Sequence, residues 1–261
     1  MLQLPHMNLL KRIGTSAVLL LTVAIFIKIN KFHYLAAMIH VGLVSELIYL
    51  QIKKTIPKSL MIYGSIYALL PLFLLHSVFS TAAFISLCVA CIVDVSGYVG
   101  GRIASKITTA KKLAPTISPN KTIAGAICGF ISLTLIHICQ TNLPITPAIF
   151  WMISLAVCIY FNKLVVHLLL SSIMLAIQYF TPMFTYPTLI QHLQPVILCY
   201  QAFLTALAGD LLVSYFKRKY HIKDTSNFLP GHGGFWDRFD AYNALMFMTT
   251  IAYNLSCSNI R

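Results

Sequence analysis

The chain alternates between long apolar runs and short polar segments. About nine runs come close to the roughly 20 residues that a helix needs to cross about 30 Å of hydrocarbon, because each helical residue rises about 1.5 Å. They fall near residues 13–30, 34–51, 59–78, 80–100, 123–140, 145–161, 164–184, 192–213 and 240–256. The pattern predicts an all-α, polytopic integral membrane protein with about nine transmembrane helices.

Composition indicates the same class. Of the 261 residues, 58% are hydrophobic and 10% are charged, and the mean hydropathy is +0.81, whereas a typical soluble domain has about 25% charged residues. No internal repeat, low-complexity tract or long linker divides the sequence, so we expect a single membrane domain over residues 1–261. Basic residues precede the first apolar run, as in a secretory signal, but no clear small-residue cleavage site follows. We therefore expect an uncleaved first helix.

The charge balance is strongly basic, with 19 Lys and Arg against 6 Asp and Glu and a net charge of +13. In a soluble protein this excess would suggest nucleic-acid binding. Here the basic residues gather in alternate loops, while the loops near residues 79, 142 and 186 carry no Lys or Arg; the first loop, with Lys28 and Lys31, is the exception. Under the positive-inside rule the basic loops face the cytoplasm. We expect contact with membrane lipid and no nucleic-acid partner.

Two polar segments, residues 94–121 and 210–240, interrupt the apolar pattern. The expected topology puts both on the cytoplasmic face, where they can form one site. In the first segment Pro115 and Pro119 exclude a continuous helix. Its basic side chains suit phosphate: Arg102, Lys111, Lys112 and Lys121. The alternative is a solvated loop whose lysines set the topology or contact anionic lipids.

Two acids lie inside or at the end of apolar runs, where a carboxylate is costly unless it faces a polar cavity or a cation. We expect Asp94 to serve function, and pairing with Arg102 is the alternative. Glu46 either lines an interior cavity or pairs with a neighbouring helix. Beside Arg102, Gly100 and Gly101 would allow the backbone to approach a ligand closely.

The second polar segment begins at the end of an apolar run. Asp210 and Ser214 are four apart and share a helix face, with Lys217 one further turn along. The helix dipole disfavours a carboxylate at a C-terminus, so Asp210 needs another reason, which a nearby cation would supply. Asp237 and Asp240 open the last run, where the dipole favours acids, and a capping role is the alternative.

The residue types in this segment indicate chemistry on phosphate. Hard cations such as Mg²⁺ take oxygen ligands from carboxylates, substrate phosphates and water, and Asp210 with Asp237 fits that arrangement. Cationic groups and a flexible glycine turn surround them, as expected for phosphoryl or nucleotidyl transfer: Lys217, Arg218, Lys223, Arg238, Gly233 and Gly234. His232 would donate to phosphate or act as acid or base, or simply be exposed.

Residues 214–240 read S-Y-F-K-R-K-Y-H-I-K-D-T-S-N-F-L-P-G-H-G-G-F-W-D-R-F-D. This stretch resembles the full signature of the phosphatidate cytidylyltransferases, also called CDP-diacylglycerol synthases, and every fixed position is present. Gly209-Asp210-Leu211 and residues 112–122, K-L-A-P-T-I-S-P-N-K-T, resemble two further motifs of that family. Val213 and Ala124 depart from the pattern, because such families commonly carry acids there.

The resemblance implies a nucleotidyltransferase that moves CMP from CTP to phosphatidic acid, giving CDP-diacylglycerol and pyrophosphate, with Mg²⁺ required. We assign the metal to Asp210 and Asp237. Catalytic roles fall to Lys217, Arg218, Lys223, Asp224, His232, Arg238 and Asp240. Substrate binding falls to Asp94, Arg102, Lys112, Ser118, Lys121, Thr122, Ser214, Gly233 and Gly234. We expect a bacterial inner membrane, with the active site facing the cytoplasm, and leave a homodimer open.

Two other classes are alternatives. A transporter or lipid-binding protein would suit Asp94 and Glu46 as part of a permeation path, but it gives no reason for the H-G-G-x-x-D-R-x-D pattern. The second alternative is a related lipid enzyme, such as a lipid kinase or a CDP-alcohol phosphotransferase. The phosphotransferase would be expected to show a D-G-x-x-A-R motif, which does not occur in this sequence.

Overall fold

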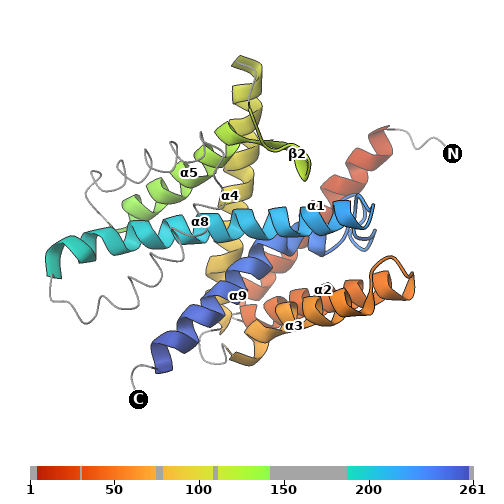
Figure 1. Ribbon diagram of the computed structural model, residues 1–261, viewed down its shortest axis with the longest axis horizontal. Helices are drawn as coiled ribbons and strands as arrows, with labels where there is room; N and C mark the ends of the chain where they lie inside the picture. Colours follow the sequence, from red (N-terminus) through yellow and green to blue (C-terminus); the bar gives the residue numbers. More distant parts are fainter. Residues whose placement is uncertain (1–4, 30, 75–78, 108–110, 142–186, 259–261) are drawn as a thin grey trace. The chain divides into compact units, whose positions relative to one another are not determined.

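The computed structural model describes residues 5–29, 31–74, 79–107, 111–141 and 187–258 (Figure 1). Helices predominate in this part of the chain. They are α1 (Pro5–Lys28), α2 (Phe32–Ile52), α3 (Lys58–Leu74), α4 (Phe79–Ile107), α5 (Ile123–Thr141), α8 (Pro187–Lys219) and α9 (Trp236–Ser258). Two short strands, β1 (Lys112–Ala114) and β2 (Ser118–Thr122), precede α5. Each helix matches one of the predicted apolar runs, so the mostly helical fold is confirmed.

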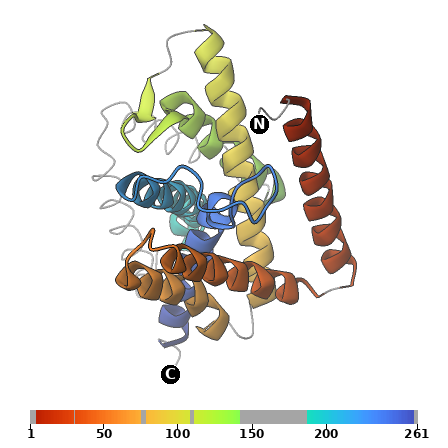
Figure 2. The ribbon, with the colours of Figure 1, turned by 90° about the vertical axis from the view of Figure 1, so that its right-hand side faces the viewer.

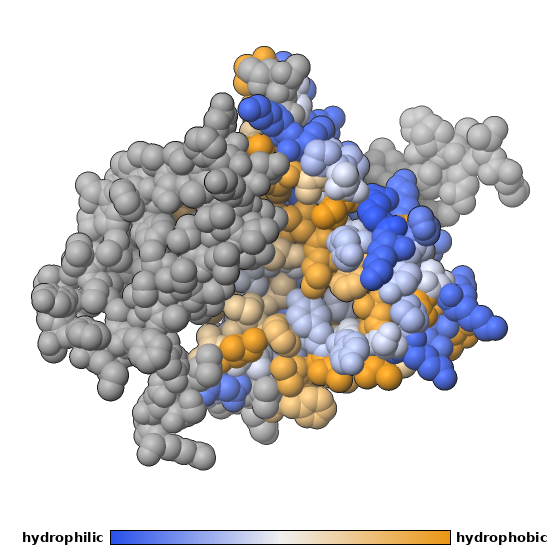
Figure 3. All heavy atoms as spheres, in the orientation of Figure 1, coloured by the Kyte–Doolittle hydropathy of each residue, from blue (hydrophilic) through white to orange (hydrophobic). Residues whose placement is uncertain are grey.

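The number of transmembrane helices stays a prediction. The expected runs at 145–161 and 164–184 lie outside the described residues. Among the described helices, α2 and α4 are long and apolar enough to cross a membrane, and shorter apolar helices occur within α1, α3 and α5. Large apolar side chains are also exposed, for example Leu20 at 71% and Phe73 at 75%, and apolar residues colour much of the described surface in Figure 3. Exposed apolar surface of this kind is typical of membrane contact.

The chain divides into two compact units. Unit 1 comprises Met1–Leu87 and Leu212–Arg261, and unit 2 comprises Cys88–Leu211. The unit boundaries fall within α4 and within α8. The expectation of a single membrane domain stays a prediction.

Unit 1 is organised around a helical hairpin. α2 packs along α3, and both contact α9 (Figure 2). The buried side chains of α2 recur at helical spacing, with Leu35, Ile39, Leu43 and Leu47 four residues apart, so one face of the helix meets its neighbours. From α9, Tyr242 and Met246 are fully buried in the same unit. This face of α2 also carries Glu46, whose contacts are described below.

Unit 2 contains the β1–β2 hairpin followed by α5. Lys112 pairs with Thr122, and Ala114 pairs with Ser118, in antiparallel register. The two prolines therefore do end the helical pattern, as predicted. The sequence did not predict strands, however, because neither strand has the alternation of apolar and polar residues that marks a half-buried strand.

The glycines at the end of α4 have a packing role. A Cβ on Gly100 would lie 2.4 Å from the Cys128 side chain, and one on Gly101 would lie 2.6 Å from Thr122 Oγ1. On the facing helix, a Cβ on Gly125 would lie 2.4 Å from the Gly97 carbonyl oxygen. The space beside Gly100 and Gly101 is thus filled by α5 and its first turn. The expectation that these two glycines open space for a ligand is wrong, because helix packing occupies it.

Candidate functional site

The site in unit 1 is built on the loop between α8 and α9. This loop contains a tight turn, in which Leu229 N donates to Gly233 O at 2.9 Å and His232 N donates to Leu229 O at 2.9 Å. Gly231 and Gly233 have φ values of 77° and 89°, a conformation that only glycine adopts without strain. The P-G-H-G-G stretch therefore forms a hydrogen-bonded turn that requires glycine, and its expected flexibility stays a prediction.

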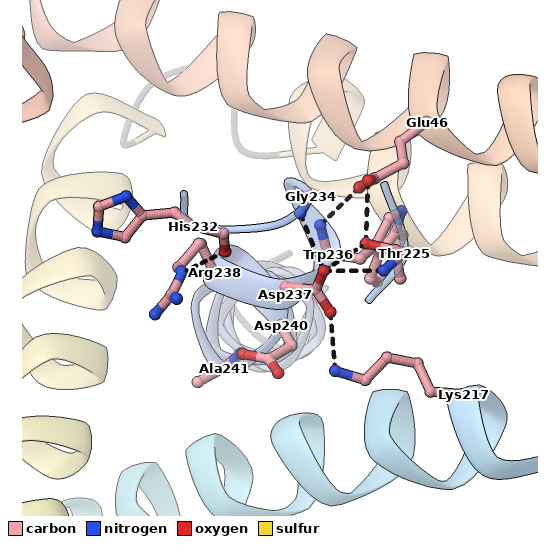
Figure 4. Close-up of polar contacts among 10 residues, drawn as sticks. All are labelled: Glu46, Lys217, Thr225, His232, Gly234, Trp236, Asp237, Arg238, Asp240 and Ala241. Atoms are coloured by element: carbon pink, nitrogen blue, oxygen red, sulfur yellow. Dashed lines mark hydrogen bonds and ion pairs between the residues drawn. The ribbon is translucent and has the colours of Figure 1, made fainter. Parts of the chain in front are cut away.

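Asp237, in the first turn of α9, is the centre of a polar network (Figure 4). Lys217 Nζ, from the end of α8, donates to Asp237 Oδ1 at 2.8 Å. The other oxygen, Oδ2, accepts from Thr225 N at 2.8 Å, Thr225 Oγ1 at 3.0 Å and Gly234 N at 2.9 Å. The carboxylate therefore ties three parts of the sequence together and does more than cap its own helix.

The ionisation of Asp237 follows from these contacts. Burial raises the pKa of its carboxyl group. The hydrogen bond and charge of Lys217, together with the N–H groups of Gly234 and Thr225, outweigh that effect and hold the pKa below the usual range. Charge-assisted hydrogen bonds of this kind favour the carboxylate form. Asp237 is consequently an anion at neutral pH.

Glu46 is a member of this network whose role the sequence left undecided. It comes from α2 and is fully buried. Its Oε2 accepts from Trp236 N at 2.8 Å, and its Oε1 lies 2.9 Å from Thr225 Oγ1. The Thr225 hydroxyl carries one proton, so it donates to either Glu46 or Asp237 at any moment. Glu46 thus fastens the loop and the first turn of α9 to α2, as Figure 4 shows.

The position of Glu46 explains one glycine of the H-G-G motif. A Cβ on Gly234 would lie 1.7 Å from Glu46 Oε1 and 2.3 Å from Thr225 Oγ1. Any side chain there would displace the glutamate or the threonine. The available sequence signal was the lone acid within the apolar run of α2, since a buried carboxylate needs partners.

His232 lies on the other side of the turn. Its Nε2 is 3.2 Å from Ser16 Oγ of α1, and its carbonyl oxygen accepts from Arg238 Nε at 3.0 Å. Its Nδ1 is buried and has no hydrogen-bond partner among the described residues. In Figure 4 the imidazole points away from Asp237. The structure therefore does not group the His232 ring with the Asp237 network.

The remaining predicted residues of unit 1 differ in exposure. Arg218, Lys223, Asp224 and Arg238 are exposed, and Ser214 is partly buried. Asp240 is buried, and its Oδ1 accepts from Ala241 N at 2.7 Å. Phe239 departs from helical geometry between the two acids of α9. The exposed cations are accessible to an anionic ligand, whereas Asp240 is tied to the backbone.

A second group of predicted residues belongs to unit 2. Lys121, at the end of β2, forms an ion pair with Asp210 of α8. A cation near Asp210 was expected, and within this unit a lysine supplies it. Thr122 Oγ1 accepts from Gly125 N at 3.0 Å, which caps the start of α5. The predicted role of Thr122 in substrate binding stays a prediction beside this structural role.

Other predicted ligands of unit 2 lie at its surface. Lys112 and Asp94 are exposed, and Ser118 is partly buried in β2. Arg102 donates from its guanidinium to the Tyr98 hydroxyl, and its Cζ lies 5.8 Å from the centre of the Tyr98 ring. Tyr98 is thus a partner of Arg102 that the sequence did not indicate.

The donor chemistry of the two proposed metal ligands fits Mg²⁺. Each carboxylate already forms an ion pair with a lysine ammonium group. Asp210 pairs with Lys121, and Asp237 pairs with Lys217. The N–H groups of Thr225 and Gly234 occupy Oδ2 of Asp237, so this residue could offer its Oδ1 to a cation. Among the described residues no group of three or more His, Cys, Asp or Glu forms a metal cluster. Any ion would therefore take most of its ligands from phosphate and water.

Comparison with known proteins identifies the class of protein. The chain matches the cytidylyltransferase family over residues 17–257. It therefore belongs to that family. No solved structure matches the chain.

Several bacterial relatives are phosphatidate cytidylyltransferases. That of Rickettsia bellii (strain RML369-C) is 33% identical over 154 residues, which make up 59% of this chain and 49% of the relative. That of Rickettsia prowazekii (strain Madrid E) is 29% identical over 241 residues, 87% of this chain and 83% of the relative. That of Staphylococcus haemolyticus (strain JCSC1435) is 34% identical over 149 residues, which make up 57% of this chain and 40% of the relative. In the first and third matches the chain spans about half of the relative or less.

Proposed function

We propose that this chain is a phosphatidate cytidylyltransferase, which transfers CMP from CTP to phosphatidic acid. The observation that carries the proposal is the Lys217–Asp237 pair at 2.8 Å, which is joined to the glycine turn by the hydrogen bond from Gly234 N to Asp237. Both residues belong to the stretch that resembles the signature of that family. The names of the bacterial relatives support the same activity.

The reaction needs alignment and charge neutralisation more than a strong base. A phosphate oxygen of phosphatidic acid, already an anion, attacks the α-phosphorus of CTP. A new P–O bond forms, the bond from the α-phosphorus to its bridging oxygen breaks, and pyrophosphate leaves with that electron pair. Preorganised cations stabilise the charge that builds up on the phosphoryl oxygens.

Residues of unit 1 would supply these cations. Lys217 is held in place by Asp237, so its ammonium group is positioned before substrate arrives. Arg218, Lys223 and Arg238 are exposed and would bind the triphosphate or the lipid phosphate. The ring of His232 points away from Asp237, so we propose that it binds a substrate group or holds the turn against α1.

Mg²⁺ is the proposed cofactor. Asp237, through Oδ1, and Asp210 are the residues that would bind it, and the ion would neutralise negative charge on the triphosphate. The roles assigned from sequence to the other predicted residues stay predictions: Asp94, Arg102, Lys112, Ser118, Lys121, Thr122, Ser214, Asp224, Gly233, Gly234 and Asp240. Each is tested by its own substitution.

The proposed location is a bacterial inner membrane, with the active site on the cytoplasmic face. The apolar helices and the bacterial relatives support association with a membrane, and the loop charges support the orientation. CTP is a cytoplasmic nucleotide, and phosphatidic acid is a membrane lipid. The mechanism requires neither a nucleic acid nor a second copy of the chain.

Conversion of radiolabelled CTP tests the proposal. Purified protein in detergent would be given phosphatidic acid, and the label in the organic phase would be measured with and without Mg²⁺. We expect metal-dependent formation of CDP-diacylglycerol. Folded protein that makes no labelled lipid under these conditions would overturn the assigned activity.

A further inference from the structure

Unit 1 contains an apolar pocket beside the Asp237 network. Helices α2 and α3 and the final part of α8 enclose it, with Leu50, Leu60 and Leu212 among the lining residues, and its volume is about 90 Å³. Gly64 of α3 also lines it. A Cβ on Gly64 would lie 2.8 Å from Leu47 Cδ1, so the glycine leaves room where α2 and α3 approach each other.

Three residues belong both to the pocket and to the polar network. They are Lys217, Thr225 and Trp236. Their polar atoms face the network: Lys217 Nζ bonds Asp237, the Thr225 hydroxyl contacts Glu46 and Asp237, and Trp236 N bonds Glu46. The indole Nε1 of Trp236 is also satisfied, since it donates to Leu43 O at 2.9 Å. The surface that these residues turn to the pocket is therefore apolar.

This arrangement would suit an amphiphile with a phosphate at one end. Lys217 supplies positive charge where the pocket meets the network, and the interior offers only apolar contact. A nucleotide base has polar edges that would lose their hydrogen bonds to water in such a pocket without gaining others, which is costly. A hydrocarbon chain loses nothing there and gains from burial.

We propose that this pocket receives part of an acyl chain of the phosphatidic acid substrate. The inference rests on the proposed function, because it supposes a lipid phosphate near Lys217. In phosphatidic acid only the glycerol carbons separate the phosphate from the acyl esters. One molecule can thus place its phosphate at the network and the start of a chain in the pocket.

Filling the pocket gives a kinetic test. Leu60→Trp places a large side chain among the lining residues. The matched control is Ile66→Trp on the same helix, at a residue that is 54% exposed and does not line the pocket. Both variants would be assayed with dioleoyl phosphatidic acid and with diacetyl phosphatidic acid, which lacks the methylenes that would fill the pocket, and thermal unfolding would be recorded for each.

The expected result depends on chain length. Excluding about two methylenes from the pocket should raise the KM of Leu60→Trp for the dioleoyl substrate about ten-fold. The KM for CTP should stay unchanged, the KM for the diacetyl substrate should be affected less, and Ile66→Trp should behave like the wild type. Equal losses with both lipids, or an unchanged KM for both, would overturn the proposal.

Photolabelling tests occupancy without any substitution. Wild-type protein would be irradiated with phosphatidic acid that carries a diazirine on one acyl chain, and the labelled peptides would be mapped. We expect label on the residues that line the pocket, which fall within 47–67 and 212–236, with competition by unlabelled phosphatidic acid. Label outside the pocket would overturn the proposal. Equal labelling by a diazirine phosphatidylcholine would also overturn it, because the site would then be an unselective lipid site.

The two proposals fail differently. If CTP conversion is absent but phosphatidic acid labels the pocket selectively, the cytidylyltransferase activity is wrong and the acyl site stands. If conversion is present but the label falls outside the pocket, the activity stands and the acyl site is wrong.

Discussion

Lys217 and Asp237 are 20 residues apart in sequence, and their side chains meet at 2.8 Å. The pair connects the end of α8 to the start of α9. Both side chains are largely buried, with 17% and 7% of their surfaces exposed. A lysine fixed in this way presents a positive charge in one place, which suits the binding of phosphate.

Lys217→Gln should abolish most of the activity. Losing one preorganised positive group at a phosphoryl-transfer site typically costs about 100-fold or more in rate. It also leaves Asp237 largely buried without its cation, so the protein should be destabilised. CDP-diacylglycerol synthesis and thermal unfolding measure the two effects.

Lys219→Gln is the control for this substitution. Lys219 is exposed on the same helix, and we assign it no role. Activity should stay within about two-fold of the wild type, as for most surface substitutions. If both lysine variants lose activity equally, net charge matters rather than the pair.

The pH dependence of stability should report Asp237. Its folded pKa is depressed, so the ionised carboxylate stabilises the fold above the unfolded pKa of about 4, and this contribution is lost as the pH falls through the folded value. The Tm difference between wild type and Asp237→Asn should therefore stay constant from about pH 7 to about pH 4 and then shrink. A difference that disappears above about pH 5 would mean that another group controls it.

Glu46 should be a positioning residue, with a clear distinction between two variants. In Glu46→Gln the amide oxygen can accept from Trp236 N, and the amide nitrogen can donate to Thr225 Oγ1. Glu46→Leu removes both contacts and leaves the buried Trp236 N–H unsatisfied, which costs about 1–3 kcal/mol. We expect Glu46→Gln to keep most of its activity and Glu46→Leu to lose both stability and activity.

Kinetics and rescue distinguish this role from general destabilisation. For Glu46→Leu, kcat should fall even at a temperature where the protein is fully folded. The loop should also become more sensitive to proteolysis than in Glu46→Gln. If Glu46→Gln is as inactive as Glu46→Leu, the negative charge itself is required and the positioning role is wrong.

Gly234→Ala should disrupt the site although it adds a single methyl group. The new Cβ would lie 1.7 Å from Glu46 Oε1. Gly14→Ala in α1 is the matched control, because a Cβ there has nothing within 4 Å. In a helix, that control should be neutral or stabilising by up to about 1 kcal/mol. Thermal unfolding of the two variants would test this, and a Gly234→Ala protein as stable as Gly14→Ala would contradict the contact.

Much of the fold could be predicted from the apolar runs. Each described helix coincides with one run, because about 20 consecutive apolar residues leave few other structures for a chain in lipid. The β1–β2 hairpin could not be predicted, since Pro115 and Pro119 exclude helix without specifying what replaces it. The transmembrane helices expected at 145–161 and 164–184 lie outside the described residues and stay predictions.

The candidate site was predicted less completely. Residue types predicted phosphate chemistry for the segment from Ser214 to Asp240, but they did not predict which side chains meet. The Lys217–Asp237 pair depends on the path of the loop between α8 and α9, and the buried position of Glu46 depends on packing between distant parts of the chain. The prediction for Gly100 and Gly101 was wrong, because a single sequence does not distinguish a glycine that makes room for a ligand from one that makes room for a packed helix.

The bond from Trp236 N to Glu46 joins residues 190 positions apart. The ribosome synthesises α2 long before α9, so the Trp236 N–H group that bonds Glu46 is absent until most of the chain has been made. During that interval the glutamate is a polar group in an apolar helix with no loop to hold. Once the C-terminal segment has been made, Glu46 of α2 can bond the first turn of α9. Truncated chains that end before Trp236 should be recognised as unfinished by cellular quality control.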